Sequence, residues 1–299
     1  MAELVDALPW GGSTREGVQV QILFAAPINK KGSDFMLSFD GEMLHFKEDV
    51  VKNGLANILI IHGIAEHQGR YDHVVEALNK AKFNVFRFDL RGHGRSGGKR
   101  GYVKNLSVLL NDVYHLVEHI KGKYAGKIFL LGHSLGGGIA NIYASQYFNI
   151  DGYISSGAAS DMVPQVKPFK VIPYQLVKGV TIKNNLSNNS LATIKQVEDD
   201  YQNDPYVLKK YKIGYLAEVM IKGSKLLKKN YAQITVPALI MHGAGDPIVP
   251  AQFSITLHDK IASLDKQLII FEKSLHEIYN DVEREDVIEA TIDWLRAHV

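Results

Sequence analysis

Cysteine is absent from the 299 residues of this sequence. Its absence excludes disulfides, thiol nucleophiles and thiolate metal sites. Long apolar runs are missing too, since none approaches the roughly 20 residues that a membrane-spanning helix needs. The N-terminus also lacks the basic start, apolar run and small-residue cleavage site of a secretory signal. We therefore expect a cytoplasmic protein.

The sequence also lacks a large excess of charge of either sign. The chain has 34 Lys and Arg against 32 Asp and Glu, a formal net charge of +2. This balance does not indicate a nucleic-acid partner, and no basic block, zinc-ligand spacing or stacking motif points to one. With 46% hydrophobic and 22% charged residues, the composition is that of a soluble globular protein with room for one large core.

The most informative stretch, residues 127–140, reads KIFLLGHSLGGGIA. Its apolar run at 128–131 predicts a strand buried on both faces, and a helical pattern follows GHSLG at 132–136. A serine at such a corner lies on a strained, tight turn, so the residues two positions before and after it must be small. The start of the helix favours developing negative charge at the serine oxygen. The pattern is the G-x-S-x-G nucleophile elbow, and Ser134 is the candidate nucleophile.

The same formula occurs a second time, as GRSGG at 94–98. Ser96 there lies among Arg, Gly, His and Lys residues, and no apolar helical pattern follows it. We therefore expect Ser96 to lie in a loop and not to act as a nucleophile.

Strand and helix patterns alternate along most of the chain. A hairpin at 36–39 and 43–47, around an Asp40-Gly41 turn, comes first. Strands are then predicted over 55–61, 85–89, 128–131, 153–156, 237–242 and 267–271. Helices are predicted over 71–82, 105–121, from the elbow to about 148, over 251–261 and at the C-terminus. This alternation predicts an α/β fold, a mostly parallel central sheet flanked by helices.

The alternation breaks between about Asp161 and Asn230. Three prolines interrupt an apolar stretch there, and helical pieces are expected over 191–200 and 207–227. We interpret residues 161–230 as an inserted helical cap, and 36–160 with 231–299 as the α/β core. Residues 1–35 fit neither part, so we expect a loosely attached extension or the product of an upstream start codon.

The predicted cap is basic. Residues 161–230 hold 12 Lys and no Arg against 6 Asp or Glu, a net charge of +6, which leaves −4 for the rest of the chain. A basic, partly apolar cap is suited to peripheral contact with anionic membrane or micelle surfaces, here through Lys222, Lys225, Lys228 and Lys229. A solvated helical face explains the same charges equally well.

Two further residues complete a candidate catalytic set. A serine hydroxyl needs an adjacent base that is itself held by a carboxylate. Asp246 comes four residues after the predicted strand 237–242, and His276 five residues after the strand 267–271. Open α/β sheets place their sites beyond the carboxyl ends of such strands. The order Ser134, Asp246, His276 is that of the α/β-hydrolases.

Backbone donors for an oxyanion are predicted at two positions. One is the N–H of Leu135, the residue after the nucleophile, and the other is the N–H of Ile64, in the loop after strand 55–61. The neighbouring residues Glu66, His67, Arg70 and Tyr71 are expected to brace this loop by hydrogen bonds and a salt bridge.

Several segments resemble one known family. HGIAEHQGRY at 62–71, FDLRGHGRSGGKRGYV at 88–103, GHSLGGGIA at 132–140, DDYQNDPYV at 199–207 and HGAGDPIVP at 242–250 are similar to the monoacylglycerol lipase and lysophospholipase branch of the α/β-hydrolases. The resemblance covers roughly Met36 to the end. It implies ester hydrolysis on a single acyl chain, a mobile cap over an apolar acyl pocket, and neither cofactor nor metal. The family's nucleophile, acid and base fall on Ser134, Asp246 and His276, and its oxyanion donors on Ile64 and Leu135.

Ile64 stands where that family often has a smaller residue, and its bulk is expected to narrow the pocket mouth. We therefore predict a serine hydrolase that cleaves monoacylglycerol or lysophospholipid esters through an acyl-enzyme.

Other functions use the same scaffold. Cleavage of soluble short-chain esters or of short N-terminal peptides stays open, since a fold does not determine its substrate. A dehalogenase would need a carboxylate at position 134. A non-catalytic binding protein would be expected to have lost one of the three catalytic residues, and all three are present.

Overall fold

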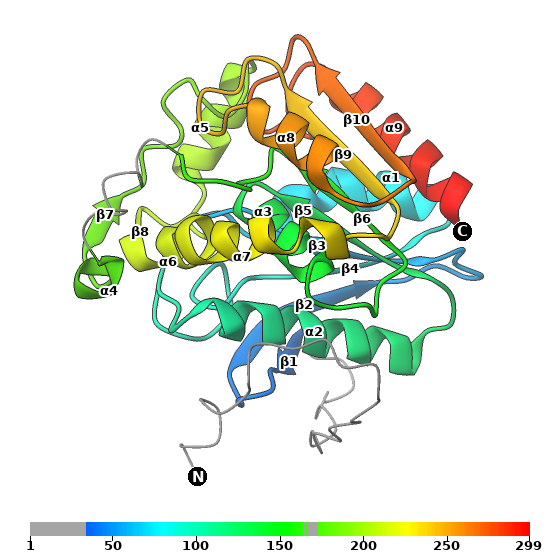
Figure 1. The fold of residues 1–299 in the computed structure, drawn as a ribbon, viewed down its shortest axis with the longest axis horizontal. Coiled ribbons are helices and arrows are strands. Elements are labelled where there is room, and N and C mark those ends of the chain that lie inside the picture. The colour runs from blue at the N-terminus through cyan, green and yellow to red at the C-terminus, as the bar shows by residue number, and fades with distance from the viewer. Residues whose placement is uncertain (1–33, 164–165, 167–172) are drawn as a thin grey trace.

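The computed structural model describes residues 34–163, 166 and 173–299. The strands of its central sheet are β1 (Phe35–Leu37), β2 (Met43–Asp49), β3 (Asn57–Ile61), β4 (Asn84–Phe88), β5 (Ile128–His133), β6 (Gly152–Ser156), β9 (Ala238–Gly243) and β10 (Lys266–Phe271). They lie in the order β1-β2-β4-β3-β5-β6-β9-β10. Strands β1, β2 and β4 pair antiparallel, and every pair from β4 to β10 is parallel. The predicted α/β fold with a mostly parallel sheet is confirmed (Figure 1).

Helices cover both faces of this sheet. They are α1 (Asp72–Lys80), α2 (Leu106–Lys123), α3 (Leu135–Ala144), α8 (Gln252–Lys260) and α9 (Arg284–His298). Successive side chains of a strand point to opposite faces. Accordingly, Ile58 and Ile60 of β3 pack with α1 and α9, whereas Leu59 and Ile61 pack with α2 and α3. Because neither face of β3 meets water, its sequence is apolar throughout and shows no alternation.

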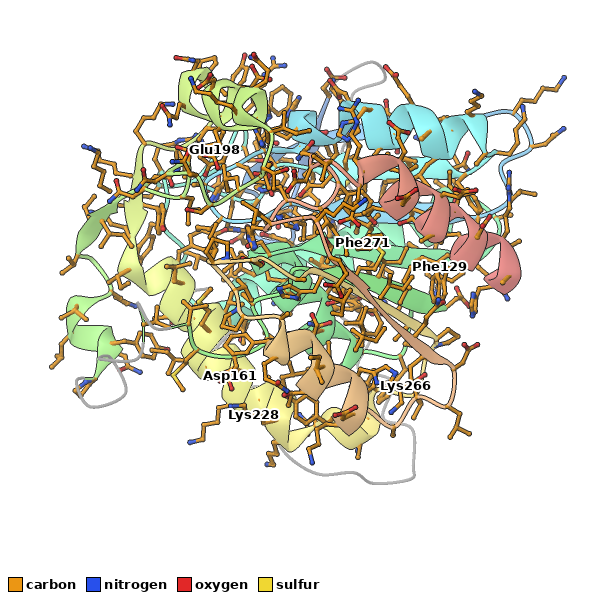
Figure 2. The ribbon with its side chains drawn as sticks, turned by 90° about the horizontal axis from the view of Figure 1, so that it is seen from above. Phe129, Asp161, Glu198, Lys228, Lys266 and Phe271 are labelled. Carbon is orange, nitrogen blue, oxygen red and sulfur yellow. The ribbon has the colours of Figure 1, made fainter. Side chains whose placement is uncertain are left out.

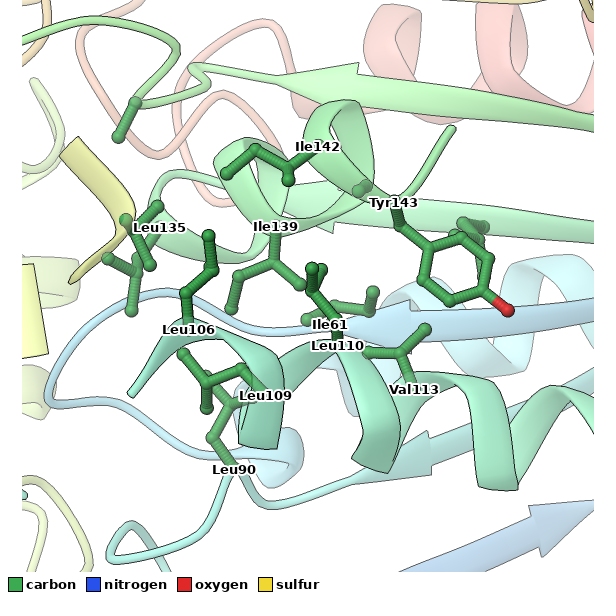
Figure 3. Close-up of a cluster of buried hydrophobic side chains, with 14 of the residues drawn as sticks. Ile61, Leu90, Leu106, Leu109, Leu110, Val113, Leu135, Ile139, Ile142 and Tyr143 are labelled. Atoms are coloured by element: carbon green, nitrogen blue, oxygen red, sulfur yellow. The ribbon is translucent and has the colours of Figure 1, made fainter. Parts of the chain in front are cut away.

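Helix α2 shows how local sequence and packing agree. It begins at Leu106, one residue after the predicted start, and Asn105 caps it, since the Asn105 side chain accepts a hydrogen bond from the Val108 N–H at 3.1 Å. Its apolar stripe then faces α3 and the end of β3 (Figure 3). The contacting side chains come from three elements: Leu106, Leu109, Leu110 and Val113 of α2, Ile139, Ile142 and Tyr143 of α3, and Ile61 of β3.

Some predicted bounds shift by a few residues. The strand predicted from position 55 begins at Asn57, and the helix after Ser134 ends at Ala144 and not near 148. The Ser145 hydroxyl donates to the Ile142 carbonyl at 2.7 Å, so a side chain competes with the helical backbone there. The hairpin begins at Phe35, one residue earlier than predicted. The rest of the predicted extension, residues 1–33, lies outside the described residues.

The chain leaves the sheet after β6 and returns at β9. This segment, residues 161–230, is called the insertion below. Its elements are α4 (Tyr174–Val177), β7 (Thr181–Lys183), α5 (Lys195–Asn203), β8 (Lys210–Lys212), α6 (Ile213–Ala217), the π-helical η3 (Glu218–Gly223) and α7 (Ser224–Lys229). Glu218 ties the insertion to the core, because its carboxylate accepts from the Leu106 N–H at 2.9 Å.

The prediction of a purely helical insertion is wrong, because β7 and β8 form an antiparallel pair. The helix predicted from position 207 therefore starts only at Ile213. Tyr211 in the middle of β8 is buried while Lys210 before it is exposed, so burial of one aromatic ring overrides helical propensity at these three residues. In the described part of the chain, no helix is both long enough and apolar enough to cross a membrane.

The core between α2 and the sheet predicts a stability difference between two leucines. Leu109 is fully buried and Leu264 is fully exposed. Leu109→Ala should lower the free energy of unfolding by about 2–5 kcal/mol, because it removes buried methyl groups and leaves a cavity. Leu264→Ala is the matched control and should change it by less than about 0.5 kcal/mol. Urea denaturation measures both, and equal losses would contradict the packing described.

Candidate active site

Ser134 occupies the corner between β5 and α3 in a rare backbone conformation. Its φ is +54° and its ψ is −117°. For a residue other than glycine such a conformation costs about 1–3 kcal/mol and persists only where the surroundings hold it. Three backbone hydrogen bonds hold it here: the Ser134 N–H donates to Ser156 at 2.8 Å, and the Ser134 carbonyl accepts from Gly138 and Ala159, each at 2.9 Å.

The residues two positions from Ser134 have no room for a side chain. A β-carbon at Gly136 would strike the carbonyl groups of Ile61 and His62, at the end of β3. At Gly132 it would strike the backbone of Gly136. The prediction that both positions need small residues is confirmed, and the reason is the close approach of α3 to the ends of β3 and β5.

The structure brings Ser134, His276 and Asp246 together. His276 follows β10 and Asp246 follows β9. The His276 Nε2 lies 2.8 Å from the Ser134 Oγ, and its Nδ1 lies 2.6 Å from the Asp246 Oδ2. The Asp246 Oδ1 accepts from the N–H groups of Ile248 and Val249, at 2.8 and 2.9 Å. A chain of contacts therefore runs from a fixed carboxylate through one imidazole to the serine hydroxyl.

The net effect of burial and neighbouring charges is to lower the pKa of Asp246 and to raise the pKa of His276. Burial alone would raise the pKa of Asp246, but the charges and hydrogen bonds of His276 and His242 outweigh it and hold that pKa far below 3.8. Burial alone would lower the pKa of His276, yet the Asp246 charge and hydrogen bond raise it above 6.5. The pair therefore favours an ionised aspartate beside a basic imidazole.

Two histidines that were not predicted as site residues, His133 and His242, also lie beside the candidate site. His242 Nε2 lies 3.0 Å from the Asp246 Oδ2, so it contacts the same oxygen as His276. The ring of His133 lies 4.9 Å from that of His276. Burial, followed by the nearby charge of His276, lowers the pKa of His133 well below 6.5, which favours its neutral form. The i, i+4 spacing of His242 and Asp246 was the only signal in the sequence.

The two predicted oxyanion donors lie beside Ser134. Gly63 is so close that an added β-carbon would lie 3.0 Å from the Ser134 Cβ, which puts the loop with Ile64 next to the serine. Leu135 is the first residue of α3, where a backbone N–H has no partner inside the helix. Among the backbone hydrogen bonds of the described residues, none uses the N–H of Ile64 or of Leu135.

The neighbours of this loop brace it, as predicted. The Glu66 Oε1 accepts from the Gly63 N–H at 2.5 Å and from the Tyr71 hydroxyl at 2.9 Å. Arg70 forms an ion pair with Glu66, and His67 contacts Asp204 of the insertion at 2.7 Å. These contacts immobilise the backbone on both sides of Ile64.

Ser96, the second match to the G-x-S-x-G formula, lies in a loop as predicted. Its side chain has a structural role there. Its hydroxyl donates to the Asp89 carbonyl at 2.5 Å and accepts from the His45 N–H at 2.8 Å, which joins the loop to β2. As for metals, no group of three or more His, Asp or Glu side chains in the described part of the chain is arranged to hold one.

Comparison with known proteins places the chain in a family. The family model described as serine aminopeptidase, S33, matches residues 53–283. A monoacylglycerol lipase of Mycolicibacterium smegmatis is 31% identical over 81% of this chain and 88% of its own. Phospholipase YtpA of Bacillus subtilis is 28% identical over 79% of this chain and 93% of its own.

Solved structures agree with these relatives. The crystal structure of a Paleococcus ferrophilus monoacylglycerol lipase superposes with a TM-score of 0.77 and 29% identity, over 86% of this chain and 99% of that one. The chain therefore belongs to the serine aminopeptidase S33 family of α/β-hydrolases, in the branch that contains the monoacylglycerol lipases.

Proposed function

We propose that the protein is a serine hydrolase that cleaves the carboxylic ester of single-acyl-chain lipids, monoacylglycerols or lysophospholipids. The observation that carries this proposal is the imidazole of His276, placed 2.8 Å from the Ser134 Oγ and 2.6 Å from the Asp246 Oδ2. A serine so placed is activated for attack on an acyl carbon. The names of the relatives, lipases and a phospholipase of similar length, support a lipid ester as the substrate.

The geometry supports acylation of Ser134 with proton transfer to His276 during the attack. His276 Nε2 takes the proton of the Ser134 hydroxyl while its oxygen attacks the ester carbonyl carbon. The N–H groups of Ile64 and Leu135 donate to the carbonyl oxygen as it becomes negative. Asp246 holds the imidazole by its Nδ1 and stabilises the imidazolium that forms.

Collapse of the tetrahedral intermediate breaks the bond to the alcohol, which leaves with the proton from His276. Water then enters, gives a proton to His276 and attacks the acyl-serine, and the imidazolium returns that proton to the Ser134 oxygen. The products are a free fatty acid and an alcohol, and the residues end in their starting states. No step requires a cofactor.

The substrate depends on the insertion, which we propose to be a cap over the acyl pocket, with Ile64 narrowing its mouth. Aminopeptidase activity is a second candidate function, because the matching family model is described as serine aminopeptidase. An aminopeptidase uses the same nucleophile on an amide and needs acidic groups for the substrate's amino terminus. Esterase activity on soluble short-chain esters is the third possibility, and all three differ in substrate and not in mechanism.

Contact of the insertion with an anionic membrane or micelle surface stays a prediction, as does a cytoplasmic location. The structure qualifies the basic face on which this contact depends. Lys228 lies 2.6 Å from Asp161, and Lys222 lies 4.0 Å from Glu218 (Figure 2 labels the first pair). These two charges are partly neutralised, so Lys225 and Lys229, both exposed on α7, are the stronger candidates.

A substrate panel tests the proposed function. Monoacylglycerols, lysophospholipids, p-nitrophenyl esters of increasing length and aminoacyl amides should be compared by kcat/KM. We expect kcat/KM to rise with acyl length up to a long-chain optimum, since each buried methylene contributes about 0.8 kcal/mol, or roughly fourfold. A maximum at acetate would favour the soluble esterase, and preference for aminoacyl amides would favour the aminopeptidase.

The two serine motifs provide a matched pair for the nucleophile. Ser134→Ala should lower turnover by about 10⁶-fold and abolish fluorophosphonate labelling, because the attacking oxygen is lost. Ser96→Ala should keep full labelling, although it loses two structural hydrogen bonds and should unfold at lower temperature. Mass spectrometry of the labelled protein measures both, and a label on Ser134→Ala would refute the assignment.

The pKa of His276 predicts the acidic side of the pH profile. Because this pKa lies above 6.5 and only the neutral imidazole accepts a proton, kcat/KM should fall as the pH drops through a value above 6.5. Asp246→Asn removes the charge that raises the pKa, so the fall should move to lower pH, with kcat reduced by about 10⁴-fold. An unmoved profile in Asp246→Asn would contradict the assigned role of Asp246.

A further inference from the structure

We infer that Arg70 and Glu277 are positioning residues, which hold the loop of the base and the loop of the oxyanion donor at a set separation. The inference rests on the proposed function, because it concerns how His276 and the Ile64 N–H come to face the same substrate carbonyl. Neither Arg70 nor Glu277 touches the Ser134, His276 and Asp246 side chains through a hydrogen bond or ion pair among the described residues. They act through the residues next to them.

The connection consists of one arginine between two glutamates, called the bridge below. The Arg70 Nη2 donates to the Glu277 Oε2 at 2.5 Å, and the Arg70 Nε lies 3.3 Å from the Glu66 Oε2. The other oxygen of Glu66 accepts from the N–H of Gly63 at 2.5 Å. Glu277 directly follows His276 and Gly63 directly precedes Ile64, so the bridge joins the proposed base to the proposed donor through Arg70 and Glu277, which are 207 positions apart in the sequence.

The bridge is buried, which argues for a geometric purpose. The side chains of Arg70, Glu66 and Glu277 are 9%, 4% and 3% exposed. Two carboxylates and one guanidinium withdrawn from water lose much of their mutual attraction to desolvation, so stability alone is weak grounds for such a group. The planar guanidinium fixes the direction of its hydrogen bond to Glu277, while its Nε meets Glu66 as an ion pair, so one rigid group limits the positions of both carboxylates.

The insertion covers the bridge and holds the same two loops. The Tyr201 ring centroid lies 4.8 Å from the Arg70 Cζ, a cation–π contact that closes the guanidinium off from one side. The Glu277 N–H donates to the Leu191 carbonyl at 2.7 Å, and the Leu208 N–H donates to the Ala65 carbonyl at 2.8 Å. Each loop is therefore held twice, once by the bridge and once by the insertion backbone.

The charge of the bridge also reaches the base. The titratable or charged groups near His276 include Asp246, Glu277, Glu66 and His133, with Arg70 between the two glutamates and His242 against the same Asp246 oxygen. Burial lowers the pKa of His276, the Asp246 charge raises it most, and Glu277 and Glu66 raise it further, while His133 stays neutral. Loss of the Glu277 charge therefore moves the His276 titration to lower pH. A brace without influence on the base would leave that titration unchanged.

The test uses three substitutions in the full-length protein with a p-nitrophenyl ester of fixed chain length. Glu277→Gln removes the charge, and Glu277→Asp keeps it but withdraws the carboxylate by one methylene. Arg70→Lys keeps the positive charge but loses the planar guanidinium that reaches both glutamates. Each should lower kcat by about 10- to 100-fold with KM changed less than about threefold, because misplacement by an ångström affects the transition state more than binding. Only Glu277→Gln should also move the acidic limb to lower pH. The double variant Arg70→Lys/Glu277→Asp should lose little more than the worse single one, since the two residues act as a unit.

Arg91 supplies a matched control. It is also 9% exposed and lies between two carboxylates, Asp112 and Asp40, at 2.6 and 3.0 Å, but it joins the β1–β2 hairpin to α2. Arg91→Lys should lower the unfolding midpoint and leave kcat and the pH profile unchanged. Circular dichroism and stoichiometric fluorophosphonate labelling show whether each variant folds. If Glu277→Gln does not fold, Glu277→Asp takes its place in the kcat and KM comparison.

Two outcomes overturn the inference: bridge variants that behave like Arg91→Lys, and losses confined to KM with an unmoved pH profile. Failure of the proposed function looks different. In that case the wild-type protein itself would turn over no ester and take no label at Ser134, before any substitution in the bridge is made.

Discussion

The left-handed backbone at Ser134 is the constraint on which the rest of the site depends. Its φ of +54° turns the chain from β5 into α3 within one residue. The turn is tolerated because the backbone of Gly136 packs against the carbonyls of Ile61 and His62, where a side chain would not fit. The same carbonyls begin the loop that carries Ile64. The proposed nucleophile and its proposed donor therefore share one rigid corner, and neither can shift without the other.

The parallel sheet then brings the remaining groups to that corner. The loops after β3, β5, β9 and β10 leave the sheet at the same edge, since the carboxyl ends of parallel strands coincide. Position alone does not orient a side chain, and the buried polar contacts of Asp246 do so. Its two oxygens contact the N–H groups of Ile248 and Val249 and the rings of His242 and His276, which leaves a carboxylate that cannot rotate without losing a buried hydrogen bond.

Much of this arrangement could be predicted from the sequence because it depends on local patterns. Apolar runs mark β5, β9 and β10, and the residues that follow them identified Ser134, Asp246 and His276 as candidates. Contacts between distant segments left no such pattern. Arg70 and Glu277 are 207 residues apart, and the β7–β8 pair joins two strands of three residues each, too short for any periodicity. Their positions depend on tertiary packing, which the secondary-structure propensity of a local segment does not reveal.

Besides its contacts with α2 and α3, the insertion is hydrogen-bonded to the two loops that carry His276 and Ile64. Asp281 accepts from the N–H of Thr193 in the insertion at 2.9 Å and from the N–H of Leu275, next to the base, at 2.8 Å. His67, three residues after Ile64, contacts Asp204 of the insertion. If the insertion is the proposed cap, a substrate that displaced it would break these hydrogen bonds to the loops of both His276 and Ile64. Under the proposed function, substrate choice would then depend on transition-state geometry as well as on access, because an acyl chain that left these contacts intact would keep the proposed base and oxyanion donor in position.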